Sequence, residues 1–446
     1  MPVSIQSRVH IGIVGVAVAL GCSSLVAADP KRDVPDYDGR GNTDTDADSW
    51  ALWIPRVALS PLYVVNEYLL RRPLGGLVTL AERRHWVNAI SDVFTFGPRN
   101  NYVILPTALF DFGLLPSVGV YFAGDGAWTA GNTIRLHAAT WGADWINATA
   151  LDRLMWNGGA TSVAARIDFK RQADLLFFGI GPDVTRATRS RYGLQRLDAG
   201  ASFAQRLFGE SALVLSSGIR AIAYRAGACC GDPSLGARIA DRSLAMPAGY
   251  GVDYTTLYQR AEIAIDTRAP RPASATGGYL QMHAETNIDV RNDRSWIEYG
   301  AIVGLAVDLQ SRQRTVKAQL AVDYADPLRG DVVPFNELAS LGGSLMPGFV
   351  AGWMTGRSTV AAQVGYSWPV WIWLDGQARF SVGNAFGRHL DGFIGDKLRL
   401  SADLGLTTIG KRDQGFELLL GVGTETVEQG AGITSVRLSV GSRKGF

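Results

Sequence analysis

Residues 398–408 read Leu-Arg-Leu-Ser-Ala-Asp-Leu-Gly-Leu-Thr-Thr, and this stretch decides the fold class. Apolar side chains occupy every second position, and the positions between them carry mainly polar side chains: Arg399, Ser401, Asp403 and Thr407. Successive side chains of a β-strand point to opposite faces, so this period of two predicts a strand with one apolar and one polar face.

The same alternation recurs from about residue 97 to the end of the chain and indicates about sixteen strands. An even number of this size is typical of single-chain outer-membrane barrels, in which apolar residues face lipid and polar residues face the interior. The sequence therefore predicts an all-β protein, a transmembrane antiparallel β-barrel. The predicted strands are 101–111, 114–123, 132–142, 160–170, 174–181, 191–206, 211–225, 254–268, 278–288, 295–310, 314–325, 357–368, 371–384, 397–408, 415–424 and 432–441.

The lengths of the connections support this interpretation. Both ends of such a barrel lie on one side of the membrane, so short turns follow even-numbered strands and longer loops follow odd-numbered ones. The long connections 228–253 and 326–356 follow the seventh and eleventh strands, whereas the short connection 289–294 after the ninth is an exception. A soluble β-sandwich is the alternative, but it requires neither this asymmetry nor so many strands.

Composition excludes two other classes of protein. Hydrophobic residues make up 47% of the chain, yet the mean hydropathy is only +0.07, far below that of a helical membrane protein. The net charge of +2 leaves no basic surface of the kind that binds nucleic acid. Besides Cys22, the only cysteines are Cys229 and Cys230, which we expect to be two incidental loop residues rather than a vicinal disulfide or a metal site.

The N-terminal region predicts export. Residues 1–28 resemble a secretory signal peptide, with Arg8 before a short apolar run and small residues before Asp29; a lipoprotein signal ending at Cys22 is the alternative. Residues 29–50 form an acidic leader, and 51–96 carry apolar residues at helical spacing. We expect this short amphipathic helical segment to lie at a membrane interface or to pack on or inside the barrel, which would comprise 97–446.

The polar strand faces carry charges of both signs, which we expect to line the lumen and to pair across it. Two histidines, His137 and His283, also fall on polar faces, but no nucleophile motif or metal-ligand spacing accompanies them. We therefore expect no catalytic, cofactor or metal site, and no enzyme activity. The predicted lumen charges are Arg260, Glu262, Asp266, Arg268, Asp375, Arg379, Arg399 and Asp403.

Several motifs between 341 and 386 resemble those of the bacterial surface antigen superfamily, the assembly barrels typified by BamA and TamA. They are Leu341-Gly342-Gly343 and Met346-Pro347-Gly348-Phe349 in one long loop, then Gly356-Arg357-Ser358, Gly365-Tyr366 and Gly383-Asn384-Ala385-Phe386. The resemblance implies a barrel in the outer membrane of a Gram-negative bacterium that helps to insert or move protein or lipid. A passive pore or a structural barrel is the alternative.

The resemblance also implies that the loop containing Gly342, Gly343, Pro347, Gly348 and Phe349 folds into the lumen. The family anchors this loop by an arginine, but Pro347 stands at the arginine position here, and Ser381 stands where the family commonly has an acidic residue. We therefore expect packing to hold the loop, through the fixed φ of Pro347, close approach at Gly348 and burial of Phe349.

Two further expectations concern the ends of the chain. The family's insertases carry periplasmic POTRA domains, whereas 29–96 show a leader and helices, so the chain resembles a POTRA-less branch. Phe446 is in phase with the apolar face of the last strand and resembles the C-terminal signal that is read during barrel assembly. The expected partners are outer-membrane lipids and, during biogenesis, periplasmic chaperones and the barrel-assembly machinery; the sequence identifies no functional protein partner.

Overall fold

The computed structural model describes most of the predicted barrel. The predicted signal peptide, the acidic leader, nearly all of the predicted helical segment and Phe446 lie outside the described residues. Within them, no helix is both long enough and apolar enough to span a membrane. The described residues are 93–111, 114–268, 276–309, 314–330, 332–371, 374–408 and 415–443.

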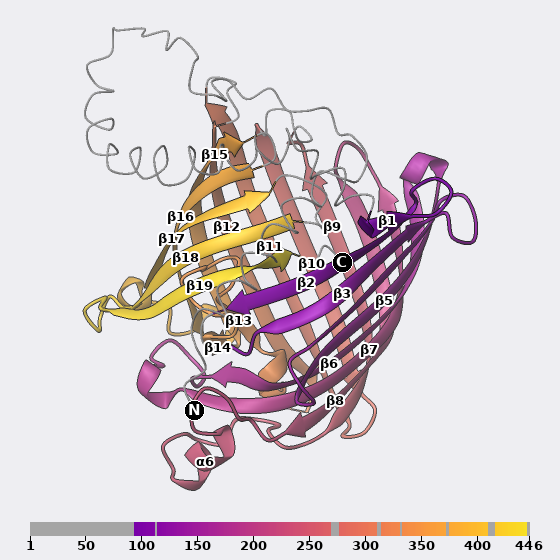
Figure 1. Ribbon diagram of the computed structural model, residues 1–446. Helices are drawn as coiled ribbons and strands as arrows, with labels where there is room; N and C mark the ends of the chain where they lie inside the picture. Colours follow the sequence, from indigo (N-terminus) through magenta and orange to yellow (C-terminus); the bar gives the residue numbers. More distant parts are fainter. Residues whose placement is uncertain are drawn as a thin grey trace, which may run out of the picture.

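Sixteen long strands of the described residues form one closed antiparallel barrel, which confirms the predicted fold class (Figure 1). Neighbours in the chain are neighbours in the sheet, and the last strand pairs with the first to close it. The strands are β2 (Tyr102–Asp111), β3 (Ser117–Asp125), β4 (Asn132–Thr140), β5 (Trp145–Trp156), β6 (Thr161–Phe177), β7 (Ser190–Arg206), β8 (Ala212–Arg225), β9 (Tyr254–Asp266), β10 (Gly277–Asp289), β11 (Arg294–Leu309), β12 (Arg314–Arg329), β15 (Ser358–Trp371), β16 (Leu374–Phe386), β17 (Arg399–Thr408), β18 (Gly415–Thr426) and β19 (Ile433–Arg443).

The remaining elements are short. The two-residue strand β1 (Thr95–Phe96) pairs with the start of β2. A small hairpin, β13 (Ala339–Leu341) and β14 (Met354–Gly356), lies between β12 and β15, and α6 (Leu235–Ala240) lies between β8 and β9. The 3-10 helices are η3 (Asn157–Gly159), η4 (Arg186–Thr188), η5 (Phe335–Glu337), η6 (Arg388–Leu390) and η7 (Gly395–Lys397).

The barrel is polar inside and apolar outside. On β17, Arg399 is 0% exposed and Asp403 is 7% exposed, while Leu404 between two inward positions is 37% exposed. The lipid-facing side chains of the neighbouring strands are more exposed still, including Phe380 at 51% and Leu420 at 54%. A soluble protein buries its apolar residues, so this inverted pattern fits a wall surrounded by hydrocarbon.

The predicted number of strands is right, but two errors cancel. Strand β5 was not predicted, because Asp152 and Arg153 put charge on both faces near its end and obscure the alternation. Strand β6 was predicted as two strands, 160–170 and 174–181. The structure instead continues one strand through the polar run after Phe169, with an irregularity in register between Gln172 and Leu175.

The two ends of the barrel differ. The long connections 178–189, 226–253, 330–357 and 387–398 all lie at one end, which we call the loop end. The connections at the opposite end, which we call the turn end, are mostly shorter. Strands β6 and β7 have 17 residues each, or about 55 Å. About 9–11 residues suffice to span the hydrocarbon, so these strands project beyond the membrane.

Candidate functional site

Residues 333–356 of the long connection between β12 and β15, which we call the inward loop, lie inside the barrel (Figure 1). Its hairpin β13–β14 packs on the wall, and the residues between the two strands form the tip of the loop. At the start of the tip, Gly342 and Gly343 turn the chain with φ of +121° and +67°. These two glycines let the chain reverse direction at the start of the tip.

The loop tip forms a dry core with the wall. Phe349 is 0% exposed, and its ring lies 5.3 Å from that of Trp353. Trp353 in turn stacks at 3.9 Å on Phe178, which belongs to the connection after β6. The other buried members of this core are Leu176, Val184, Leu341, Met346, Val350, Met354, Ala361 and Ala385.

Gly348 allows the tip to lie directly against the wall. A Cβ at this position would stand 2.0 Å from the backbone oxygen of Val422 on β18, closer than any real contact. Any other residue would therefore push the tip away from β18. Gly348 therefore lies in close contact with the backbone of β18.

Polar side chains of the wall hold the tip as well. Ser401 Oγ accepts a hydrogen bond from Gly348 N at 2.8 Å, and Ser435 Oγ donates to Gly348 O at 2.7 Å. Arg437 Nη1 lies within hydrogen-bonding distance of Pro347 O at 3.3 Å and of Phe349 O at 3.4 Å. The expectation that packing alone holds the loop is therefore incomplete, because the wall supplies a cation where the motif lacks one.

Ser381, which stands at the family's acidic position, takes part in a different contact. It is 0% exposed and accepts a hydrogen bond at 3.1 Å from Gln363 Nε2. The same amide nitrogen lies 3.2 Å from Ser344 O and 3.0 Å from Leu345 O of the loop. A neutral amide thus holds this side of the tip.

The base of the inward loop is fixed to the opposite wall by charge. Glu337 in η5 lies 3.4 Å from Arg220 on β8 and accepts a hydrogen bond at 2.5 Å from Tyr254 OH on β9. The side chains of Glu337 and Arg220 are 4% and 7% exposed. The loop consequently bridges the lumen, with its base on β8–β9 and its tip on β17–β19.

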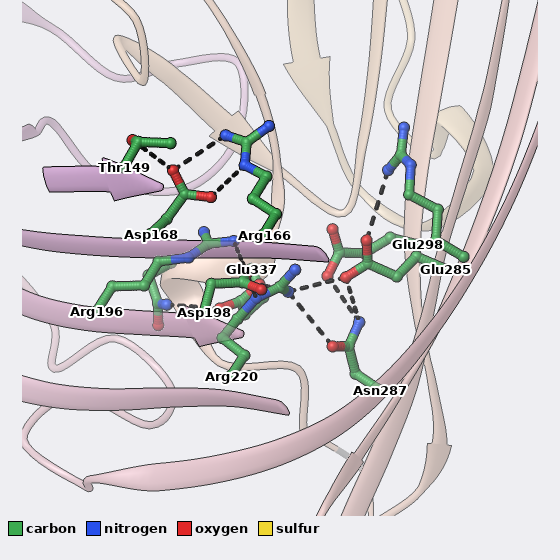
Figure 2. Close-up of polar contacts among 12 residues, drawn as sticks. Thr149, Arg166, Asp168, Arg196, Asp198, Arg220, Glu285, Asn287, Glu298 and Glu337 are labelled. Carbon is green, nitrogen blue, oxygen red and sulfur yellow. Dashed lines mark hydrogen bonds and ion pairs between the residues drawn. The ribbon is translucent and has the colours of Figure 1, made fainter. Parts of the chain in front are cut away.

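Arg220 is the centre of a larger polar network, shown in Figure 2. It also binds Asp198 on β7 at 3.1 Å and Glu285 on β10 at 2.8 Å. On the same wall, Glu298 accepts a hydrogen bond at 3.0 Å from the indole of Trp296. A buried guanidinium surrounded by carboxylates stays charged, so Arg220 holds β7, β8, β10 and the loop base in one arrangement.

The predicted lumen charges mostly pair along the wall rather than across the lumen. Arg260 lies 3.0 Å from Glu262 on the same strand and 3.5 Å from Glu285 on β10. Asp266 accepts a hydrogen bond from Arg268 Nε at 2.8 Å. These four residues therefore stabilise the β9–β10 side of the barrel and bring no reactive groups together.

The remaining predicted charges are on β16 and β17. Arg379 Nη2 lies 2.9 Å from Asp403. Arg399 lies 2.6 Å from Glu425 and also donates to the backbone oxygen of Val184 in the connection after β6. Asp375 is buried at 4% exposure near the turn end. Arg399 is the member of this group that ties a loop to the wall.

The seam that closes the barrel, where β19 meets β2, has few pairs among the described residues. These three register pairs are Ser439↔Asp111, Val440↔Phe110 and Gly441↔Leu109. The described residues of β2 and β3 form eight pairs, and those of β16 and β17 form ten. Few ladder hydrogen bonds therefore hold the described part of this junction, and an ion pair between Arg437 and Asp111 at 2.6 Å lies beside them.

Sequence reasoning missed Arg437 and Asp111. Both lie in predicted strands, but the resemblance placed the loop's cation in the loop itself and gave no reason to examine the last strand. The alternation did contain a signal, because Ser435, Arg437 and Ser439 form the polar face of 432–441.

A disulfide bond joins Cys229 and Cys230 at the loop end, so the expectation of two incidental residues was wrong. The pair precedes Asp232, which binds Arg189 at 2.9 Å and Arg191 at 2.7 Å. The disulfide therefore lies in a connection that is tied to the barrel rim.

Among the described residues, no group of three or more His, Cys, Asp or Glu side chains could hold a metal ion. His137 lies 3.0 Å from the hydroxyl of Thr107, and His283 lies 3.5 Å from Asp323. Each of these contacts joins wall strands. The site is thus an inward loop and a seam, held together by packing and charge.

Comparison with solved structures shows which known proteins have a similar fold. No protein-family model matches the sequence, and no curated protein matches it. A structure of BamA from Haemophilus ducreyi lacking POTRA domains 1–3 is similar at a TM-score of 0.54 and 12% identity, over 77% of this chain and 70% of that one. The barrel fold is therefore that of outer-membrane proteins of Gram-negative bacteria.

Two further solved structures match with lower scores. CdiB from Acinetobacter baumannii has a TM-score of 0.46 at 11% identity, over 76% of this chain and 59% of that one. OccK10 from Pseudomonas aeruginosa has a TM-score of 0.34 at 10% identity, over 77% of this chain and 98% of that one.

Proposed function

We propose that this chain is an assembly-type barrel of the outer membrane whose wall opens sideways at the seam between β2 and β19, so that protein or lipid can pass between the lumen and the bilayer. The observation that carries the proposal is the seam, whose described residues form three register pairs. An unpaired backbone group in hydrocarbon costs several kcal/mol, so a junction with few pairs is where opening breaks the fewest bonds.

The inward loop favours this function over a passive pore. It bridges the lumen from Arg220 to β19, and Phe349 at its tip is fully buried. A steady aqueous pathway needs an open lumen, which this loop obstructs. The similarity in fold to BamA supports the proposal at the level of architecture.

Cross-linking the seam tests the proposal. Phe110 and Val440 are register partners across the seam, so Phe110→Cys with Val440→Cys would lock it in a background where Cys229 and Cys230 are serine. The matched control is Val364→Cys with Phe380→Cys, a lipid-facing pair of register partners on β15 and β16.

The readout is the outer-membrane protein and lipid content of a strain that lacks the native gene, in which we expect a defect. We expect the oxidised seam variant to leave this defect uncorrected and reduction to restore correction, while the control variant corrects it in both states. Full correction by the locked seam, together with a large steady conductance in planar bilayers, would instead establish the passive pore.

A further inference from the structure

Arg437 contacts the seam and the loop tip at the same time. Its Nε and Nη2 atoms face the Asp111 carboxylate, at 2.9 Å and 2.6 Å to the nearer oxygens. Its Nη1 atom faces Pro347 O at 3.3 Å and Phe349 O at 3.4 Å. The planar guanidinium presents its donors in a fixed fork, so one orientation of the side chain serves both sets of acceptors.

The loop tip is attached to the last strand rather than to the first. Ser435, two residues before Arg437 on β19, donates to Gly348 O at 2.7 Å. The carbonyl oxygens of Pro347, Gly348 and Phe349 therefore all face donors on β19. On β2, the Asp111 carboxylate has no described contact with these carbonyl groups.

We infer that the seated loop tip closes the seam by holding Arg437 in the orientation that binds Asp111. The side chains of Arg437 and Asp111 are 14% and 9% exposed, so either one left alone would be a poorly solvated charge. When the tip leaves, Nη1 loses both carbonyl acceptors and the fork is free to turn away from Asp111. Loop seating and seam closure are then coupled, and the coupling is equal in both directions.

This inference rests on the proposed lateral opening for its biological meaning, but it can be tested without any assembly activity. The readout is the rate at which the cysteine pair Phe110→Cys and Val440→Cys oxidises in refolded protein, because that rate reports how often the seam is closed. The pair Val364→Cys and Phe380→Cys reports the general integrity of the wall in the same variants.

Two variants unseat the tip to different degrees. Gly348→Ala introduces a Cβ that would stand 2.0 Å from Val422 O, and Ser435→Ala removes only the hydrogen bond to Gly348 O. We expect Gly348→Ala to slow oxidation at the seam about five-fold or more, with a smaller effect in the same direction for Ser435→Ala. Oxidation of the control pair should not change in either variant.

The decisive measurement is a double-mutant cycle with Arg437→Gln. If Arg437 carries the coupling, Gly348→Ala has no further effect on the seam once Arg437 is glutamine. Arg437→Lys should retain only part of the coupling, because an ammonium lacks the fork. If Gly348→Ala does not fold, Ser435→Ala provides the same cycle.

Equal seam oxidation rates in the parent and the tip variants, or effects of Gly348→Ala and Arg437→Gln that simply add, would overturn the inference. These outcomes differ from failure of the proposed function. For example, loop seating and seam closure could be coupled while the protein still functions with its seam locked. That result would contradict lateral opening but would support the role of Arg437.

Discussion

The ring of Phe349 occupies the space that a side chain on Gly423 would need. A Cβ built on Gly423 would lie 2.4 Å from Phe349 Cζ, and the two residues come from the inward loop and from β18. The wall therefore has a recess at this glycine, and the loop has the one large apolar side chain that fills it. This fit makes the loop part of the barrel's interior rather than a mobile cover.

Removing the ring should loosen this plug. Phe349→Ala deletes a fully buried aromatic side chain, a change that costs about 3–5 kcal/mol of the free energy of unfolding, and it should raise conductance in planar bilayers. Urea unfolding and single-channel recording measure both effects. The matched control is Phe380→Ala on the lipid face. Equal conductance in the two variants would show that Phe349 does not block the lumen.

The base of the loop gives a second test. Glu337→Gln keeps the shape of the side chain but removes the charge that faces Arg220. Because Arg220 retains Asp198 and Glu285, we expect a loss of about 1.5–3 kcal/mol in the free energy of unfolding. Asp293→Asn, which breaks an ion pair with Arg329 in which both side chains are more than 70% exposed, should change little. A similar small change for Glu337→Gln would mean that the buried contact does not stabilise the loop.

The disulfide tests whether the loop end faces the cell exterior, as expected if its longer connections are extracellular loops and the shorter connections of the turn end are periplasmic turns. Cys229 and Cys230 should react on intact cells with a membrane-impermeant thiol reagent only after mild reduction, because the bond blocks both sulfurs. A variant with serine at both positions provides the background. Labelling that requires a broken outer membrane would place the loop end in the periplasm.

Alkaline pH should loosen the connection 226–253 through Tyr250, whose ring lies 5.7 Å from that of Tyr224. Burial raises the pKa of the Tyr250 hydroxyl above its usual 10.0, and a backbone hydrogen bond to Gly236 partly opposes the shift. A raised pKa means that the neutral phenol stabilises the folded state below pH 10.0, and that this contribution is lost as the pH rises through the folded value. Proteolysis of the connection 226–253 should therefore accelerate in the parent protein as the pH rises through the folded-state pKa of Tyr250. The acceleration should be smaller in Tyr250→Phe. Identical pH profiles would exclude Tyr250 as the cause.

Phe446 remains the proposed signal for assembly into the membrane. Deleting it should lower the folded outer-membrane fraction, because the last strand must be recognised before it can close the barrel. Heat-modifiable migration on gels measures the folded fraction, and Phe446→Leu, which keeps an apolar terminus, should fold better than the deletion. Unchanged abundance after deletion would remove the assembly role.

The alternation of 398–408 and its neighbours was sufficient to predict a barrel, because lipid outside and polar groups inside impose a period of two on nearly every strand. Where the local pattern is weak, prediction failed. Strand β5 was missed at Asp152 and Arg153, and β6 was divided at the polar run before its bulge. A strand continues through such positions because it pairs with its two neighbouring strands. This pairing cannot be predicted from the strand's own residues.

The sequence by itself determined that the wall is a barrel of alternating strands, that glycines lie in the long loop 326–356, and that the last strand has a polar face. Only the tertiary structure decided what those parts do together. Arg437 and Asp111 are 326 residues apart and become partners because closing the barrel brings the last strand to the first. Glu337 and Arg220 are 117 residues apart and meet because the loop turns inward. Pairing across such distances depends on the geometry of the closed barrel, whereas a period of two depends on one strand and the medium that surrounds it.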